Sequence, residues 1–350
     1  MVFDGITRSY IVYTPSSYTP GTPLPLVFVL HGFTQTAQNI MDVSGFNNVA
    51  DTGNFIVAYP NGVGNAWNSN SGMTGGSTAD DIGFIKALTD TLFNLYGIDT
   101  TRVYSCGFSA GGYMSHRLAC ESSQCFAAIA SVSGTMSTAA YTACNPTRTT
   151  PALQIHGTAD AIVSYNGGIG GVSVDDVIAK WVSLDACPTI PAVVGLPNTN
   201  STDNSTVECS SYYPCSSNSE VKLLKVINGG HQWPGTNALL GGLGTINRDI
   251  NASAEIWNFV RNYSCNTIST SVVKPQELSI TLEHLAADFY RVNLEFPAVV
   301  SYTVYDLHGR KMLSANTTND GIIDISLLEH GYYVLVLAAN NMVVSYRLLL

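Results

Sequence analysis

The stretch RVYSCGFSAGGYMSHRLAC, residues 102–120, decides the fold of the longer part of the chain. It opens with an apolar run that predicts a buried strand over 102–106, and residues 110–120 predict a helix. Ser109 lies on the turn between them, with glycines on both sides. Glycines fit a sharp strand-to-helix turn, because larger side chains there would collide with neighbouring backbone. The pattern therefore predicts a serine that projects from the carboxyl end of a sheet.

The rest of the first 265 residues alternates short apolar or β-branched runs with helical stretches. Strands are predicted over 8–13, 26–30, 55–59, 102–106, 127–132, 152–156 and 221–227. Helices are predicted over 81–96, 110–120, 174–184 and 252–263. This alternation is typical of a mostly parallel sheet that helices cover.

A polar stretch, PNTNSTDNSTVECSSYYPCSSNSE, interrupts this alternation over 197–220 and predicts a surface excursion. A disulfide between Cys187 and Cys215 would close its base, and loop-closure entropy would make that bond worth about 3.5 kcal/mol. The chain has eight cysteines, and the pairing of the remaining ones stays open. Their spacing shows no metal-site grouping, so we expect export to an oxidising compartment and no metal site.

Composition excludes two classes of protein. Charged residues make up 11% of the 350 residues, the formal net charge is -10, and Lys and Arg do not cluster, which argues against a nucleic-acid partner. The strongly apolar run over 24–30 is too short for a transmembrane segment. The opening MVFDGITRSY lacks the basic start and apolar stretch of a signal peptide, and we expect that a leader was removed.

A serine hydroxyl is a weak nucleophile, so the turn predicts catalysis only if the chain also supplies a base and an orienting acid. In a strand–turn–helix architecture of this kind, the order along the chain is serine, acid, histidine. Asp160, in PALQIHGTAD, follows a predicted strand, and His231, in KVINGGHQWPG, lies on a loop just beyond another. The other histidines precede this acid or belong to a second domain. We therefore predict Ser109 as nucleophile, Asp160 as acid and His231 as base.

Two backbone amides are predicted to form an oxyanion hole. The amide of Ala110 begins the helix after Ser109, where it can donate to a developing negative charge. The amide of Phe33 follows the buried run of LPLVFVLHGFTQ and can point into the same site. For His31 we favour a role in fixing this loop over a chemical role.

Each of these residues also has a purely structural interpretation. GFSAG is compatible with a plain glycine-rich turn, Asp160 with a turn aspartate that bonds its own backbone, and His231 with an ordinary loop histidine. Asp80 and Asp81 precede a predicted helix, where capping or a dipole interaction is favoured over chemistry.

Three aromatic residues on loops, Trp67, Tyr165 and Trp233, fall near the expected edge of the sheet. Aromatic side chains there often form a platform for a ring or an acyl chain, so we predict that they bind substrate. The alternative is that each one covers the core.

Four blocks, LHGFTQTAQN, GFSAGGYMSHRLAC, IHGTADAIVSYNGG and GGHQWPG, resemble blocks of a family of secreted esterases. That family has the α/β-hydrolase fold and includes polyhydroxybutyrate depolymerases, feruloyl esterases and acetylxylan esterases. The resemblance covers about residues 5–263 and implies a triad of Ser109, Asp160 and His231 that works without a metal or organic cofactor. The chain departs from the family at Ser164, where relatives often carry proline. This departure bears on loop rigidity and leaves the triad unchanged.

After Cys265 the sequence changes character. A polar stretch over 267–277 predicts a linker between a catalytic domain, 1–266, and a small all-β sandwich, 278–350, in which only strand-like alternation occurs. YDLHGRKML and DISLLEHGYYVLVLAANNMVVSYRLLL resemble the C-terminal sorting domain of the type IX secretion system, although VVKPQELSI stands where the usual Asn-Pro opening would be. The resemblance implies an address for secretion machinery. A carbohydrate- or polymer-binding sandwich is the alternative.

These observations together predict a secreted or cell-surface serine esterase that acts through an acyl-enzyme. The expected substrates are feruloyl or acetyl esters on plant polysaccharide, with polyester depolymerisation of the polyhydroxybutyrate type as the alternative. An acyltransferase and a non-catalytic polymer-binding protein are less favoured, because nothing in the sequence identifies an acceptor site and the triad predicts an acyl-enzyme.

Overall fold

The chain forms two compact units, Met1–Thr267 and Ile268–Leu350. The computed structural model describes residues 1–69, 76–168, 170–238, 242–265, 281–286, 289–293, 299–306, 310–318, 321–329, 331–339 and 342–349. The predicted catalytic domain, 1–266, ends next to the division between the units. The predicted linker, 267–277, lies outside the described residues.

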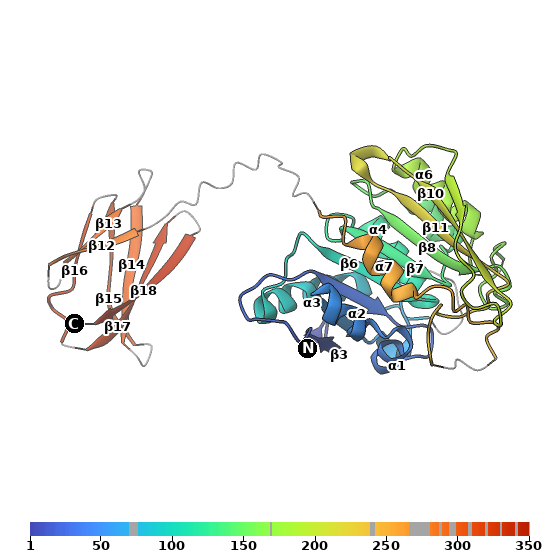
Figure 1. Ribbon diagram of the computed structural model, residues 1–350. Coiled ribbons are helices and arrows are strands. Elements are labelled where there is room, and N and C mark those ends of the chain that lie inside the picture. The colour runs from blue at the N-terminus through green and yellow to red at the C-terminus, as the bar shows by residue number, and fades with distance from the viewer. Residues whose placement is uncertain are drawn as a thin grey trace. The chain divides into compact units, whose positions relative to one another are not determined.

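A central sheet organises the first unit (Figure 1). Its described strands lie in the order β3 (Tyr10–Tyr13), β5 (Ile56–Pro60), β4 (Leu26–Leu30), β6 (Val103–Phe108), β7 (Ala128–Val132), β8 (Ala152–Gly157), β11 (Val221–Ile227), β10 (Thr206–Tyr212) and β9 (Ala192–Gly195). From β5 to β11 the neighbours are parallel, whereas β3, β10 and β9 pair antiparallel at the two edges. The carboxyl ends of the parallel strands therefore meet at one edge of the sheet, where the candidate site lies.

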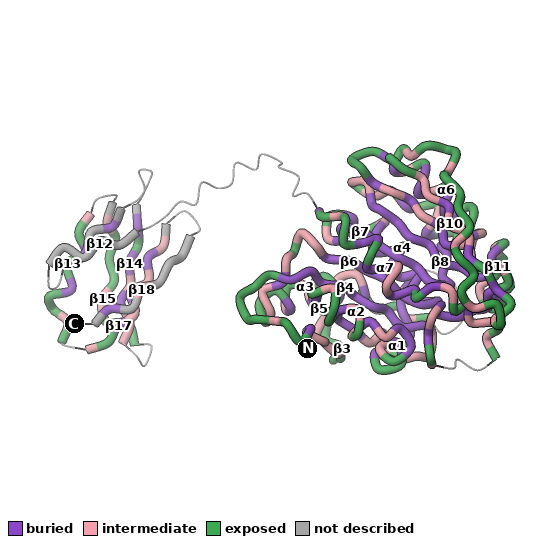
Figure 2. Tube along the Cα trace, in the orientation of Figure 1, coloured by how far each residue is buried: buried purple, intermediate pink, exposed green. Residues whose placement is uncertain are grey.

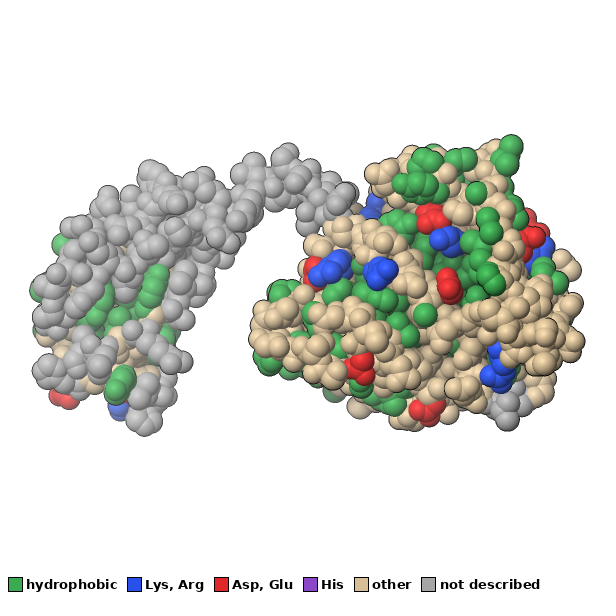
Figure 3. Space-filling model, in the orientation of Figure 1, with side chains coloured by type: hydrophobic (Ala, Val, Ile, Leu, Met, Phe, Trp, Pro, Cys, Tyr) green, Lys and Arg blue, Asp and Glu red, His purple; other side chains and the backbone are tan. Residues whose placement is uncertain are grey.

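Both faces of this sheet are covered, which explains why its central strands are apolar throughout. In β4, Leu26, Phe28 and Leu30 pack into one core cluster, and Val27 and Val29 pack into another, because successive side chains point to opposite faces. The central strands appear as continuous buried segments in Figure 2. Charged side chains are sparse on the face of this unit drawn in Figure 3.

Two sets of helices cover the sheet. The first cluster is completed by α3 (Asp81–Tyr96), α4 (Ala110–Glu121) and α6 (Val174–Leu184). The second is completed by α1 (Ala37–Ser44), α2 (Phe46–Gly53) and α7 (Ala252–Val260). The shorter elements of this unit are β1 (Val2–Phe3), β2 (Ile6–Thr7), α5 (Thr138–Ala143) and the 3-10 turns Val63–Asn65 and Ser216–Asn218.

The predicted strands and helices all occur, and α3 and α6 have the predicted bounds. The helices α1, α2 and α5 were not predicted. The prediction of a surface excursion over 197–220 was wrong in one respect. Within this segment, β10 pairs along its whole length with β11 and extends the sheet. The serine-rich composition of this segment does not indicate a strand, and the backbone hydrogen bonds of β10 are made with its neighbour β11.

The second unit is a small all-β structure. One described sheet has the order β12 (Thr281–Ala286), β13 (Phe289–Asn293) and β16 (Ile322–Asp324). The other has the order β15 (Lys311–Thr318), β14 (Val299–Asp306), β17 (Tyr332–Ala339) and β18 (Met342–Leu349), and all described neighbours are antiparallel. Buried Val292 and Ile323 from the first sheet share one core cluster with Val304 and Leu335 from the second.

Candidate active site

Ser109 occupies a strained turn between β6 and α4. Its backbone angles are φ 53 and ψ -118, a positive-φ conformation that a non-glycine residue adopts at a cost of roughly 1–3 kcal/mol. The flanking glycines make this turn possible. A Cβ on Gly107 would lie 2.4 Å from the backbone of Gly111, and a Cβ on Gly111 would lie 2.1 Å from the carbonyl oxygen of Leu30. The predicted steric reason for the glycines is therefore visible in the backbone itself.

Asp160 lies on the loop after β8 and uses its two carboxylate oxygens differently. Oδ1 accepts hydrogen bonds from the amides of Ile162 and Val163, at 2.9 and 2.8 Å, which fixes the loop. Oδ2 accepts from Nδ1 of His231 at 2.8 Å. The turn-aspartate interpretation and the predicted contact with histidine are thus both present in one side chain.

The Asp160 carboxyl is held in its ionised form. Burial raises its pKa, but hydrogen bonds and charge from His156 and His231 outweigh burial and hold the pKa well below its ordinary value. The carboxylate can therefore stay negative while a histidine beside it gains a proton.

His231 lies on the loop after β11, and its backbone amide donates to the carbonyl of Leu243 at 2.7 Å. Its imidazole packs against the ring of Phe108, with centroids 4.8 Å apart. Phe108 directly precedes Ser109, so the imidazole lies beside the turn. Among the described residues, no hydrogen bond joins Ser109 to His231. Such contacts often tighten only when substrate binds.

The two predicted oxyanion donors are the amides of Ala110, next to Ser109 in sequence, and of Phe33, on the loop after β4. The amide of Ala110 is the first of α4, where backbone amides have no partner inside the helix. The amide of Phe33 follows β4 and has no protein acceptor within the described part of the chain. The amide of Thr34, next in sequence, donates to the carbonyl of Asn65 at 2.9 Å. The loop is thus held while the Phe33 amide stays available.

His31 fixes this loop, as we expected. Its Nε2 accepts from the amide of Gly62 at 3.0 Å, so Nδ1 carries the proton and donates to the carbonyl of Gly32 at 2.7 Å. Burial lowers its pKa to about 4, which keeps the ring neutral near neutral pH.

The three aromatic residues predicted to bind substrate are buried, with exposed fractions of 2% for Trp67, 6% for Tyr165 and 1% for Trp233. The indole of Trp67 donates to the carbonyl of His31 at 2.9 Å, and that of Trp233 donates to Ser253 at 3.1 Å. Trp67 and Tyr165 belong to one core cluster and Trp233 to the other, which is the alternative role of covering the core. A loop aromatic looks the same in sequence whether its ring faces solvent or core, so the pattern could not separate the two.

A cavity of about 260 Å³ lies beside the Asp160 loop and was not predicted. Its described lining residues are Tyr113, Thr135, Ile162, Val163, Ser164, Gly167, Gly168, Gly170 and Gly171. Tyr113 stands one turn of α4 beyond Ser109, and its amide donates to the Ser109 carbonyl at 3.1 Å. No charged side chain is among these lining residues, so the cavity suits an uncharged group.

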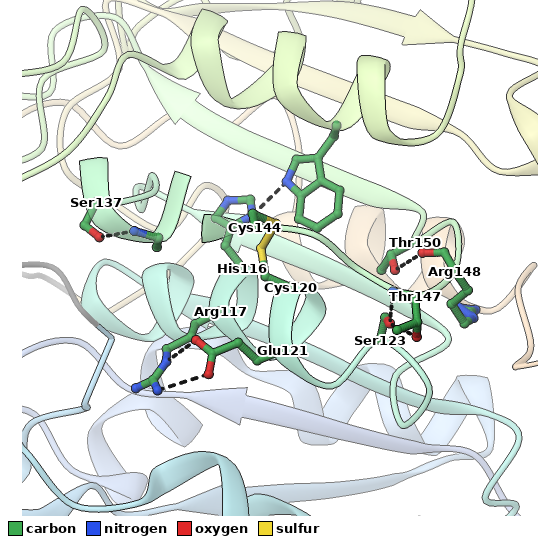
Figure 4. The surroundings of a disulfide bond; sticks show 12 residues. His116, Arg117, Cys120, Glu121, Ser123, Ser137, Cys144, Thr147, Arg148 and Thr150 are labelled. Atoms are coloured by element: carbon green, nitrogen blue, oxygen red, sulfur yellow. Dashed lines mark hydrogen bonds and ion pairs between the residues drawn. A yellow bond between two sulfur atoms is a disulfide. The ribbon is translucent and has the colours of Figure 1, made fainter. Parts of the chain in front are cut away.

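Two disulfides hold elements of this unit. Cys187 and Cys215 are bonded, the pairing considered from sequence, and Cys120 is bonded to Cys144. The bond between Cys120 and Cys144 joins the C-terminal end of α4 to the end of α5 (Figure 4). Cys120 lies one helical turn after His116. The cysteines without a disulfide are Cys106, Cys125, Cys209 and Cys265. Within the described ranges, no group of three or more His, Cys, Asp or Glu residues could hold a metal ion.

A mostly parallel sheet between helices, a serine on the turn after a strand, and an Asp–His pair at the same edge define the class of α/β-hydrolases. Residues 8–175 match the family model described as esterase PHB depolymerase. The putative esterase NocK of Nocardia uniformis subsp. tsuyamanensis is 30% identical over 256 residues, which cover 67% of this chain and 73% of that protein. The chain therefore belongs to the esterase PHB depolymerase family.

Two further relatives are enzymes of longer chains. Feruloyl esterase B of Piromyces equi is 28% identical over 239 residues, or 64% of this chain and 42% of that protein. A bifunctional acetylxylan esterase/xylanase of Neocallimastix patriciarum is 28% identical over 234 residues, or 65% of this chain and 31% of that protein. The match thus spans less than half the length of either. The solved acetyl xylan esterase from Aspergillus awamori shares the fold, with a TM-score of 0.50 at 16% identity over 72% of this chain and 94% of that one.

The C-terminal unit has its own match. Residues 260–350 fit the family model described as secretion system C-terminal sorting domain. The protein is therefore secreted or carried at the cell surface, and this unit addresses the secretion machinery. Among the helices that the structure describes, none combines the length and apolarity needed to cross a membrane.

Proposed function

We propose that the protein hydrolyses carboxylic esters through an acyl-enzyme on Ser109, with His231 as general base and Asp160 as its orienting acid. The observation that carries this proposal is the hydrogen bond of 2.8 Å between Asp160 Oδ2 and His231 Nδ1, beside the turn that presents Ser109. Because Nδ1 donates to the carboxylate, Nε2 is left as the basic nitrogen.

In the first half of the reaction, Ser109 Oγ bonds to the ester carbonyl carbon while its proton passes to His231 Nε2. The carbonyl oxygen becomes negative, and the amides of Phe33 and Ala110 stabilise it, each by about 3 kcal/mol of barrier. The carbon–oxygen bond to the alcohol then breaks, and His231 returns its proton to the leaving oxygen.

In the second half, His231 takes a proton from water, whose oxygen attacks the acyl carbon. The bond to Ser109 Oγ breaks, the serine regains a proton from His231, and the free acid leaves. Asp160 keeps its negative charge throughout and stabilises the imidazolium at each step.

For the substrate we favour feruloyl or acetyl esters on plant polysaccharide. Two relatives carry these activities in their names, and the uncharged cavity beside Asp160 suits an aryl or short acyl group. The family model's name supports the alternative, which is a polyester of the polyhydroxybutyrate type. Either substrate is polymeric, which fits an enzyme exported to where polymers are found.

The test compares hydrolysis of methyl ferulate, acetylated xylan and polyhydroxybutyrate by the full chain and by Ser109→Ala. We expect the first two to be cleaved faster than the third, and we expect the variant to lose activity on all of them. A preference for polyhydroxybutyrate would overturn the substrate choice. Equal activity of the variant would overturn the mechanism, and binding without hydrolysis would indicate a polymer-binding protein.

A further inference from the structure

A series of buried polar contacts leads from α6 to the candidate triad. Trp181 Nε1 lies 3.1 Å from His116 Nδ1, and His116 Nε2 lies 3.1 Å from Gln154 Oε1. Gln154 Nε2 lies 3.1 Å from His156 Nδ1. His156 Nε2 in turn lies 3.4 Å from Asp160 Oδ2, the same oxygen that accepts from His231. The first of these bonds is drawn at His116 in Figure 4.

The direction of every bond in this chain follows from its two ends. An indole nitrogen can only donate, so His116 accepts at Nδ1 and carries its proton on Nε2. The protonated Nε2 donates to Gln154 Oε1, which places the amide nitrogen of Gln154 toward His156. His156 then accepts at Nδ1 and carries its own proton on Nε2, facing an ionised carboxylate that can only accept.

His156 also closes the loop that holds Asp160. Its Nε2 hydrogen-bonds to the carbonyl oxygen of Val163 at 2.8 Å and lies 3.4 Å from the Asp160 carboxylate, so the N–H lies close to both acceptors. The amide of Val163 donates to the other carboxylate oxygen. The Gln154 amide reaches Gly134 as well, at 2.7 Å, and a Cβ on Gly134 would lie 2.6 Å from the Ser109 carbonyl oxygen. This series of contacts therefore reaches both the loop that carries Asp160 and the backbone beside Ser109.

Few titratable groups surround these residues. Burial lowers the pKa of His116 to about 4, so that ring is neutral near neutral pH. Tyr165 packs edge-on against His156, with centroids 6.0 Å apart, and Lys225 lies 5.0 Å above the Tyr165 ring. Tyr113, on α4, accepts a hydrogen bond from Thr135 at 2.8 Å and interacts electrostatically with Asp160. Among the described residues, His231 and His156 are the side chains next to the carboxylate that can change charge.

We infer that His156 is a positioning residue: its Nε2–H, oriented by Trp181, His116 and Gln154, holds Asp160 in place and shares its negative charge with His231. This inference rests on the proposed function. Without this N–H, the negative charge of Asp160 interacts more strongly with His231 and stabilises its protonated imidazole. His231 then acts as a base only at higher pH. Loss of the contact also loosens the carboxylate that orients His231.

The experiment measures kcat, KM and the pH profile of kcat/KM on p-nitrophenyl acetate, with active sites counted by a serine-directed sulfonyl fluoride. For His156→Phe we expect kcat to fall roughly tenfold at nearly constant KM. We also expect the acidic limb of the profile to move up by about half a pH unit. His156→Gln keeps an N–H at the position of Nε2, so its kcat and acidic limb should stay within about twofold and 0.2 pH unit of the wild type.

Tyr104→Phe is the control, because it removes a partly buried hydrogen bond, to the carbonyl of Tyr263 at 2.7 Å, at the end of β6 away from Ser109. We expect it to lower stability and leave the profile unchanged. If His156→Phe does not fold, Trp181→Phe removes the donor that sets the direction of the chain, and its acidic limb should move the same way by a smaller amount. An unmoved limb in the folded variant tested, or equal damage from His156→Gln, would overturn the inference. Wild-type protein that is neither labelled nor active would instead overturn the proposed function.

Discussion

Two buried carboxylates in the first unit, Asp81 and Asp160, are stabilised in different ways. Asp81, at the start of α3, is 1% exposed and pairs with Nη2 of Arg8 at 2.6 Å and with the amide of Asn68 at 2.7 Å. Asp160 is 5% exposed, accepts hydrogen bonds from two backbone amides and from His231, and has His156 Nε2 at 3.4 Å from Oδ2. One carboxylate faces a permanent cation, whereas the other faces side chains whose charge can change.

The pKa of each group reflects this difference. Burial raises the pKa of Asp81, and the amide of Asn68 and the guanidinium of Arg8 only partly offset it. Burial also raises the pKa of Asp160, but its donors outweigh burial and the pKa falls. At Asp160 the hydrogen bonds and charge of His156 and His231 outweigh burial, whereas at Asp81 the contacts of Asn68 and Arg8 do not. Asp81 forms a structural ion pair, whereas the proposed mechanism requires Asp160 to stay ionised while His231 takes a proton.

The largest expected difference is catalytic. Asp160→Asn should lower kcat by about 10⁴-fold, because the amide no longer holds the tautomer of His231 or stabilises its protonated form. Asp81→Asn should leave kcat per labelled active site unchanged. Ester hydrolysis by both purified variants checks this. Similar losses in both would contradict the distinction between the two carboxylates.

The next effect concerns stability. Arg8→Met should reduce the free energy of unfolding by about 3–5 kcal/mol, because it leaves Asp81 as an unpaired buried charge. Urea denaturation measures this, and the double variant Arg8→Met with Asp81→Leu is the control, since it removes both charges. The double variant should be the more stable of the two. A single variant as stable as the wild type would show that the ion pair contributes nothing.

The pH dependence of stability distinguishes Asp160 further. Its pKa in the folded protein lies below the ordinary value of 3.8, so ionised Asp160 stabilises the fold above pH 3.8. That contribution is lost as the pH falls through the folded-state pKa. The difference in Tm between wild type and Asp160→Asn should therefore be larger at pH 7 than at pH 2.5. A difference that grows toward acid would reverse the assigned sign.

The smallest effect is expected at Asp80, which caps α3 through the amide of Gly83 at 2.9 Å. Asp80→Ala should reduce the free energy of unfolding by about 1 kcal/mol, which is typical of a lost N-cap, and should leave kcat unchanged. Thermal unfolding beside Asp80→Asn, which preserves the cap, checks this value. A loss as large as that of Arg8→Met would mean that this carboxylate does more than cap the helix.

Local chemistry explains which features could be predicted from sequence. The turn at Ser109 and the bounds of α3 and α6 depend on neighbouring residues, namely the flanking glycines and the caps Asp80 and Ser173. Asp160 and His231 were predicted because parallel strands bring the loops after them to one edge. The strand β10 was missed because its polar sequence does not indicate a strand. Pairing with β11 stabilises it.

Tertiary partners explain the rest. Arg8 pairs with Asp81, 73 residues away, and His116 pairs with Trp181, 65 residues away. No sequence pattern near any of these residues indicates its partner. His156 was set aside as a base because it precedes the acid, yet it lies next to Asp160. The burial of Trp67 and Trp233 depends on which way each loop turns, which the sequence pattern does not specify.

The most direct test of the central claim is to treat the full chain with a serine-directed sulfonyl fluoride and locate the adduct by peptide mass spectrometry. The account predicts one adduct per chain, on Ser109, with ester hydrolysis falling in proportion to labelling. It predicts much slower labelling in Asp160→Asn. An adduct on another residue that abolishes hydrolysis, or full hydrolysis after Ser109 is labelled, would contradict the account.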